Sequence, residues 1–371
     1  MVLPLAADAV VHLTRAQAGL AHVDHRPSEV CLDSVTARPR LSVVAATRND
    51  DHGGNQLART QLFINGLAEQ SMRFQLPVEL LLVEWNPPPE KPPLAEALRW
   101  PRSEWFAPKL VVVPPEVHRT FPHASELPLY QMIAKNVGIR RAAADFALAT
   151  NIDILFSDEL FGFLGRELRA HAMYRAVRYD IEADLNRQPL PTPAECRALP
   201  WVRAHEPDGL RYADGRRPPW YAAARSRLNK AVWDATHGGA LPNLFTWACG
   251  DFTLTSRAVW DGFRGYPEWP IFSFHLDSLA LVLAYRAGVE MVNLEPPKVV
   301  RHLEHGAGSG WTPEGARRLF QRVDAAGIPY LDGNAYDRRA REIMRQGPGF
   351  HPVNDAAWGL ADRDLPVVTP G

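Results

Sequence analysis

Asn151 and Asp153 are the two residues whose types and spacing best suit chemistry in this sequence. They directly follow the run from Asp145 to Thr150, which is typical of a short buried strand. Alternate side chains of an extended segment point the same way, so both can face one ligand. Amide and carboxylate oxygens suit a hard divalent cation, which can in turn hold the phosphates of a diphosphate. The alternative is a plain turn after the strand, because Asn and Asp are also common turn residues.

Short apolar strands alternate with amphipathic helices over the first half of the sequence. The strands are expected at 41–46, 78–83, 109–113 and 145–150, and the helices at 57–68 and 129–143. This alternation predicts an α/β fold with a mostly parallel central sheet and helices on both faces. Ligands of such sheets bind at the carboxyl ends of the strands. Those ends are polar or acidic here, at 47–50, 84–86 and 151–153.

The second half of the sequence is less regular. Residues 180–240 lose the alternation and gain proline, arginine and tryptophan, which predicts a partly helical insertion. A regular pattern resumes over 245–255, and a helix over 276–287 precedes expected strands at 289–294 and 299–302. The expected organisation is an N-terminal arm over 1–40, one α/β domain over 41–345 and a loop-like C-terminal tail over 346–371.

The composition fits a large globular core and weighs against several other classes of protein. Of the 371 residues 46% are hydrophobic, and 41 basic against 42 acidic residues give a net charge of -1. A dedicated nucleic-acid binder would carry excess positive charge, so no nucleic-acid partner is expected. Three widely spaced cysteines without a CxxC pair favour a reducing, cytoplasmic setting. No signal peptide and no transmembrane segment is recognisable, so we expect a protein of the cytoplasm or of the membrane periphery.

The segment from Lys135 to Asp153 resembles a motif of the family 2 glycosyltransferases. In that family an N-x-G-x-x-x-A-x-G-[DE]-[FY] helix end leads into the strand that carries a D-x-D motif. The resemblance extends over residues 41–160 and, more loosely, over 245–305. Two departures from the family pattern are Asn151, which replaces the first acid of D-x-D, and Ala144, which replaces a glycine. The first leaves Asp153 as the expected metal ligand.

This resemblance implies a GT-A fold, the Rossmann-like sandwich of nucleotide-diphospho-sugar transferases. It further implies transfer of a sugar from a nucleoside-diphosphate sugar to an acceptor hydroxyl, with inversion and with Mn²⁺ or Mg²⁺ as cofactor. The acceptor would be a glycan, a glycolipid or a small molecule. Two other functions stay open: an inactive GT-A module that binds a nucleotide sugar or glycan, and a sugar nucleotidyltransferase. The P-loop, the GxGxxG fingerprint and the GxSxG elbow are absent from the sequence.

The resemblance also assigns residues to the donor nucleotide. Thr47, Asn49 and Glu84 would surround the base and ribose, with Glu84 accepting from an imide N–H; a solvated strand end is the alternative for Glu84. Asn136, Arg140 and Asn151 complete the expected donor-binding set, and a cation such as Lys135 or Arg140 can meet the diphosphate. Exposed helix charges are common, so a plain surface role is the alternative for these cations.

Metal ligands and a base are expected from the second half of the chain. His302 and His305 precede a glycine-rich loop, Gly306 to Gly310, that would close over the donor, and imidazole is an acceptable manganese ligand. Asp277 opens the helix over 276–287 and is the expected base, with Asp251 as its rival. A carboxylate that stabilises a helix N-terminus is the alternative for Asp277. Several aromatic residues suit either an acceptor surface or the core: Trp201, Trp220, Tyr221, Trp247, Trp260, Tyr266 and Trp269.

Overall fold

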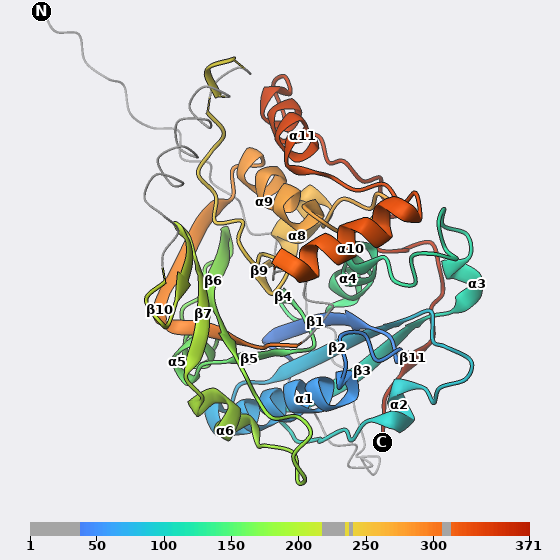
Figure 1. The fold of residues 1–371 in the computed structure, drawn as a ribbon, viewed down its shortest axis with the longest axis vertical. Helices are drawn as coiled ribbons and strands as arrows, with labels where there is room; N and C mark the ends of the chain where they lie inside the picture. Colours follow the sequence, from blue (N-terminus) through green and yellow to red (C-terminus); the bar gives the residue numbers. More distant parts are fainter. Residues whose placement is uncertain (1–37, 217–233, 237–239, 306–312) are drawn as a thin grey trace, which may run out of the picture. The chain divides into compact units, whose positions relative to one another are not determined.

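The four predicted strands of the first half form the parallel part of one large sheet (Figure 1). A computed structural model describes residues 38–216, 234–236, 240–305 and 313–371. The strands are β1 Leu41–Thr47, β2 Val78–Trp85, β3 Phe106–Val113, β4 Phe146–Thr150, β5 Ile154–Phe156, β6 Ala172–Ile181, β7 Trp201–Glu206, β8 Gly209–Tyr212, β9 Phe252–Ser256, β10 Glu290–Leu303 and β11 Val367–Val368. The helices are α1 Gln56–Phe74, α2 Leu94–Ala97, α3 Pro115–His118, α4 Gln131–Arg141, α5 Asp158–Leu164, α6 Pro193–Ala198, α8 Arg257–Phe263, α9 Leu276–Arg286, α10 Pro313–Ala325 and α11 Gly333–Arg345.

The strand order of the sheet is β11-β3-β2-β1-β4-β9-β6-β10-β5. Parallel pairing joins β3, β2, β1 and β4, and also β6 to β10. Antiparallel pairing adds β11, β9 and β5, and the β7–β8 pair extends from β6. The three longest ladders are parallel, so the predicted α/β fold with a mostly parallel central sheet is confirmed.

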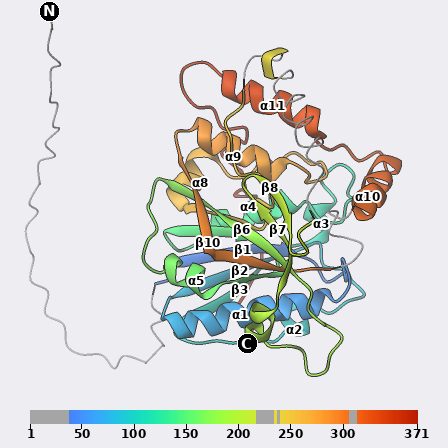
Figure 2. The same cartoon turned by 60° about the vertical axis from the view of Figure 1, so that its left-hand side comes forward.

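Helices cover both faces of the sheet, because successive residues of the buried strands point to opposite sides (Figures 1 and 2). Val43 and Ala45 of β1 pack in one core with Phe63 and Leu67 of α1. Val44 and Ala46 pack in the other core, which takes its helical residues from α4, α8, α9, α10 and α11. Strands buried on both faces need near-continuous apolar sequence, which is why β1 to β4 were visible as apolar runs.

The chain outside this parallel part departs from the predicted pattern at several points. Within 245–255, where a regular pattern resumes, strand β9 begins only at Phe252. The two expected strands 289–294 and 299–302 are one strand, β10, with an irregularity between Leu294 and Val299. The described part of the predicted insertion contains α6, β7 and β8, so it is partly strand. Its residues 217–233 and 237–239, including Trp220 and Tyr221, lie outside the described residues, as do Gly306 to Gly310 and the arm up to residue 37.

The C-terminal segment over 346–371 is mostly irregular and packs closely on the rest of the described chain. Trp358 is only 1% exposed, and β11 pairs with β3. Within the described ranges, no helix has the length and apolar character needed to cross a bilayer.

Candidate metal and donor site

The sheet reverses its direction of growth at β1, and the candidate site lies at that point. From β1 the chain passes through α1 to β2 on one side, and β4 pairs on the other side of β1. In open α/β sheets ligands bind outside the carboxyl ends of the strands at such a switch point. The segments that leave those two ends are residues 48–55 after β1 and 151–153 after β4. Fold geometry and the sequence motif therefore indicate the same place.

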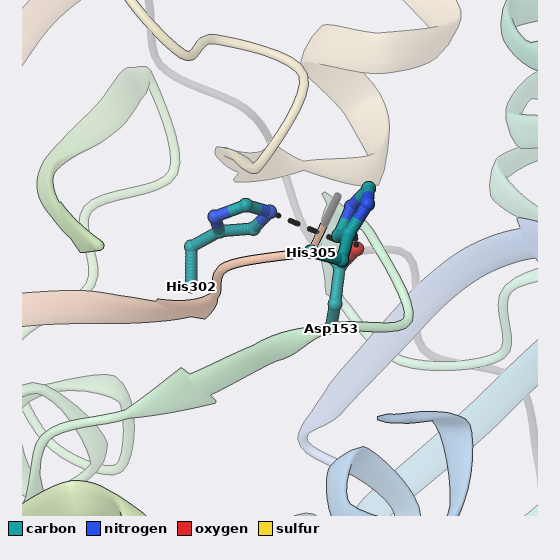
Figure 3. A group of neighbouring side chains, drawn as sticks. All are labelled: Asp153, His302 and His305. Carbon is teal, nitrogen blue, oxygen red and sulfur yellow. Dashed lines mark ion pairs between the residues drawn. The ribbon is translucent and has the colours of Figure 1, made fainter. Parts of the chain in front are cut away.

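Asp153, His302 and His305 converge at this edge of the sheet (Figure 3). The Oδ2 atom of Asp153 lies 3.2 Å from His305 Nε2 and 3.8 Å from His302 Nε2. Antiparallel pairing of β5 with β10 sets Ile154 opposite His302, which places the neighbouring Asp153 beside the histidines. All three ligand atoms lie within 4.8 Å of one another, a spacing that can hold one metal ion. The structure thus brings together the three residues expected as metal ligands.

The unpartnered atoms of this group test whether a metal fits. Asp153 Oδ1 and His305 Nδ1 are buried and have no hydrogen-bond partner among the described residues. A buried carboxylate oxygen without a donor is unfavourable, and a cation would satisfy it. One carboxylate and two imidazoles form a donor set that Mn²⁺ accepts. The residues therefore fit a divalent metal ion.

A second group of possible ligands, Asp180, His302 and Glu304, is a poorer metal site. Both oxygens of Asp180 already accept from arginine, Oδ1 from Arg178 Nε at 2.6 Å and Oδ2 from Arg203 Nε at 2.5 Å. Glu304 also pairs with Arg203, at 3.0 Å. These protein cations occupy the places that a metal would need, so the Asp153 group is the better candidate.

Arg59 of α1 is a member of the site that the sequence alone did not reveal. Its Nη1 atom donates to Asp153 Oδ2 at 2.9 Å, and its side chain is only 2% exposed. It is held in place by the carbonyl groups of Gly54 and His52. Burial alone would raise the pKa of Asp153, but His302, His305 and Arg59 outweigh that effect and hold the pKa well below its usual range. Asp153 is therefore a carboxylate whose charge is partly balanced from within the protein.

Asn151 faces Asp251 and not the metal group. Its Nδ2 donates to Asp251 Oδ1 at 2.6 Å, and its Oδ1 accepts from Gln131 Nε2 at 3.0 Å. Asp251 Oδ2 in turn accepts from Arg178 Nη1 at 2.7 Å. Burial would raise the pKa of Asp251, but Arg178 and His302 lower it below its usual value. Asp251, the rival candidate for the base, is thus a carboxylate whose two oxygens both accept hydrogen bonds within the protein.

Asp277 lies in the first turn of α9, as expected, and is half-buried. Its Oδ2 lies 3.1 Å from the position that a Cβ on Gly250 would take. Lys135 donates to the carbonyl of Gly250 at 2.7 Å, and burial lowers the pKa of Lys135 to about 8 although Asp251 and Asp277 act to raise it. This lysine is fully buried, so it is not the exposed helix cation of the alternative interpretation. The charges of both candidate bases, Asp251 and Asp277, act on it.

The residues expected around the nucleoside lie together at the ends of β1 and β2. Thr47 pairs in register with Glu84, and both are buried. Thr47 Oγ1 accepts from Gln56, Asn49 Nδ2 donates to the carbonyl of Pro92 at 2.9 Å, and Glu84 Oε1 accepts from the amide of Leu94 at 2.9 Å. Burial raises the pKa of Glu84. Glu84 is therefore not a solvated strand end.

Asn136 and Arg140, both expected to bind the donor, have partners outside the metal group. Asn136 is fully buried, donates to the carbonyl of Tyr266 at 2.8 Å and accepts from its amide at 2.9 Å. The Arg140 guanidinium lies over the Trp358 ring at 4.9 Å and 3.7 Å from Asp261. The helix periodicity could not show this, because these partners come from distant parts of the chain.

Aromatic residues of the second half divide between core and surface. Trp260 and Tyr266 are completely buried and belong to the core. Trp201, Trp247 and Trp269 are partly exposed, and Trp201 stacks on Tyr179 with ring centroids 5.3 Å apart. The structure therefore leaves only part of the predicted aromatic set available to an acceptor.

No family model and no curated protein matches this chain. Among solved structures, it is similar to a crystal structure of S. aureus TarS 1–349, with 15% identity, 82% of this chain and 70% of that chain covered, and a TM-score of 0.38. It is also similar to the catalytic domain of Drosophila beta1,4galactosyltransferase 7 in complex with xylobiose, with 9% identity, 85% and 84% covered, and a TM-score of 0.35.

Proposed function

We propose that this chain is a glycosyltransferase that moves a sugar from a nucleoside diphosphate to an acceptor hydroxyl. The observation that carries the proposal is the convergence of Asp153, His302 and His305 at the carboxyl end of β4. A carboxylate and two imidazoles beside a topological switch point suit a metal-bound diphosphate. Asp153, His302 and His305 would hold Mn²⁺ or Mg²⁺, which would neutralise the charge that develops on the departing diphosphate.

The chain's own residues would supply the remaining steps. Thr47, Asn49 and Glu84 line the ends of β1 and β2, where a nucleoside would be held. Asp277 would accept the proton of the acceptor hydroxyl, because its carboxylate lies half-buried in the first turn of α9, with Oδ1 accepting from the amide of Ser278 and Oδ2 beside Gly250. Asp251 is bound on both oxygens and would instead fix Asn151 and Arg178. Attack from the face opposite the diphosphate gives inversion.

Arg59 favours one alternative function. It already supplies a counter-charge to Asp153, so the chain could bind a nucleotide sugar without turning it over. Metal-dependent transfer or hydrolysis of a nucleotide sugar separates an enzyme from such a binding module.

A thermal-shift panel of UDP, GDP, CDP and dTDP, with and without Mn²⁺, tests the site. Ligands that bind only the folded state raise the melting temperature. We expect one nucleotide to stabilise the wild type only with Mn²⁺, and to lose this effect in Asp153→Ala. Asp145→Ala is the matched control, since this exposed aspartate precedes the same strand at its opposite end. No shift with any nucleotide would contradict the proposal.

A further inference from the structure

Asp180 of β6 is completely buried and accepts from four side chains. Its Oδ1 accepts from Arg178 Nε at 2.6 Å and lies 3.1 Å from His302 Nδ1. Its Oδ2 accepts from Arg203 Nε at 2.5 Å and lies 3.1 Å from His205 Nε2. Taking a carboxylate out of water costs several kcal/mol, so such a residue is retained only where its partners compensate. One arginine would balance the negative charge of Asp180, so charge balance alone does not require the contact with His302.

That contact decides where His302 carries its proton. Both oxygens of Asp180 accept from arginine Nε atoms at 2.5–2.6 Å, so Asp180 is an ionised carboxylate and can only accept hydrogen bonds. The Nδ1 atom of His302 must then be the donor of the 3.1 Å hydrogen bond. In a neutral imidazole this leaves the lone pair on Nε2. Nε2 is the atom that faces Asp153 Oδ2, at 3.8 Å.

A second branch from Asp180 returns to the same strand end. Arg178 joins Asp180 to Asp251 at 2.7 Å, and Asp251 accepts from Asn151 at 2.6 Å. Asn151 and Asp153 are two residues apart after β4. The carboxylate of Asp180 is therefore connected to both ends of the short segment from Asn151 to Asp153.

We infer that Asp180 is a positioning residue for the metal site: it fixes His302 as the Nδ1–H tautomer and aims the Nε2 lone pair at the position beside Asp153. This inference rests on the proposed function only in naming a metal as the ligand. Carboxylates that accept from the second nitrogen of a metal-binding histidine orient the ring and raise its basicity. The sequence assigns Asp180 no role, because it lies on a strand that the apolar pattern does not show.

The tautomer can be measured in the metal-free wild type. ¹⁵N-histidine NMR well above the pKa of free histidine, about 6.5, distinguishes a protonated Nδ1 from a protonated Nε2. The His302 signal is assigned by its loss in His302→Gln. We expect Nδ1 to be protonated in the wild type and the Nδ1–H population to fall in Asp180→Asn. A wild-type His302 protonated on Nε2 would overturn the inference, and this arm needs no variant of Asp180 to fold.

Metal affinity gives the second readout. We expect Asp180→Asn to weaken Mn²⁺ binding about 10–100-fold in isothermal titration calorimetry, the range typical for such outer partners. The matched control is His205→Gln, which perturbs the same carboxylate on its other oxygen and leaves the contact with His302 in place. We expect the control to bind Mn²⁺ within about 3-fold of the wild type. Equal weakening in both variants would mean that Asp180 acts only on the fold, and would overturn the inference.

The two proposals fail in different ways. If the wild type binds no Mn²⁺, the proposed metal-dependent function is contradicted, whereas the tautomer of His302 still tests the role of Asp180. If the wild type binds Mn²⁺ and a folded Asp180→Asn variant binds it equally well with an unchanged tautomer, only the inference on Asp180 is wrong.

Discussion

Arg59 reaches from α1 to Asp153 and places Nη1 2.9 Å from the carboxylate Oδ2. This ion pair is almost completely buried, with 2% and 9% of the two side chains exposed. It joins α1, the helix after β1, to the segment that follows β4. Arg59 and a bound metal would both neutralise part of the negative charge of Asp153. The free energy of unfolding should therefore depend on both.

Arg59→Gln should lower the free energy of unfolding by about 3–5 kcal/mol, because it leaves the buried carboxylate of Asp153 without its arginine partner. Saturating Mn²⁺ should recover part of that loss by supplying another cation. Urea denaturation with and without Mn²⁺ measures both quantities. Arg73→Gln on the same helix removes an exposed pair with Asp158 and should cost no more than about 1 kcal/mol. If Arg59→Gln lowers the free energy of unfolding equally with and without Mn²⁺, then Arg59 is not coupled to the metal site.

Gly53 and Gly54 offer a test of His305 with a built-in control. Both have φ +75, so alanine strains the backbone similarly at either position, by about 1–2 kcal/mol. A Cβ on Gly53 would lie 2.5 Å from His305 Nδ1, whereas a Cβ on Gly54 would meet nothing within 4 Å. We expect Gly53→Ala to displace the imidazole and weaken Mn²⁺ binding roughly 10-fold, and Gly54→Ala to leave it nearly unchanged. Calorimetric titration of the two variants decides whether His305 is a ligand.

Asp277→Asn should impair turnover, whereas Asp251→Asn should impair stability. Removal of a general base lowers turnover about 10²–10⁴-fold, so Asp277→Asn should lose turnover and keep its nucleotide affinity. Asp251→Asn should reduce stability by about 3–5 kcal/mol, since Arg178 loses a buried partner. Turnover assays and urea denaturation on both variants separate the roles. If Asp251→Asn is stable but has no turnover, while Asp277→Asn remains active, then Asp251 is the general base and Asp277 is not.

Lys135 predicts a distinct pH dependence of stability. Its pKa falls from 10.5 to about 8 in the fold, so between these values the unfolded chain binds a proton that the folded chain does not. Stability from this group therefore rises with pH across that window and is lost as the pH falls towards 8. Relative to Lys135→Met, the wild type should gain up to about 3 kcal/mol between pH 8 and pH 10.5. If the free energy of unfolding of the two proteins changes with pH in the same way, the buried lysine keeps its ordinary pKa.

The parallel part of the sheet was predictable because its strands are buried on both faces. Both faces of these strands are buried, so consecutive positions such as Val43 and Val44, and Leu80 to Leu82, are all apolar. The resulting apolar runs are visible in the sequence. β6 has the opposite character: Arg175, Arg178 and Asp180 are buried within it, and their charges hide the strand. Arg178 and Asp180 pair with each other, but their other partners and those of Arg175 lie 23 to 122 residues away, beyond any local pattern.

The sequence by itself determined the α/β class, the polar strand ends and three residues that the structure brings together, Asp153, His302 and His305. These follow from local rules, since strand periodicity and residue type are written along the chain. Tertiary structure alone decided which charges balance which. Arg59 binds Asp153, Asn136 is withdrawn into the core, and Asp180 orients His302. Strand register determines which of these residues are neighbours, and burial raises the energy of any charge that stays unpaired. Both exist only once the sheet has formed.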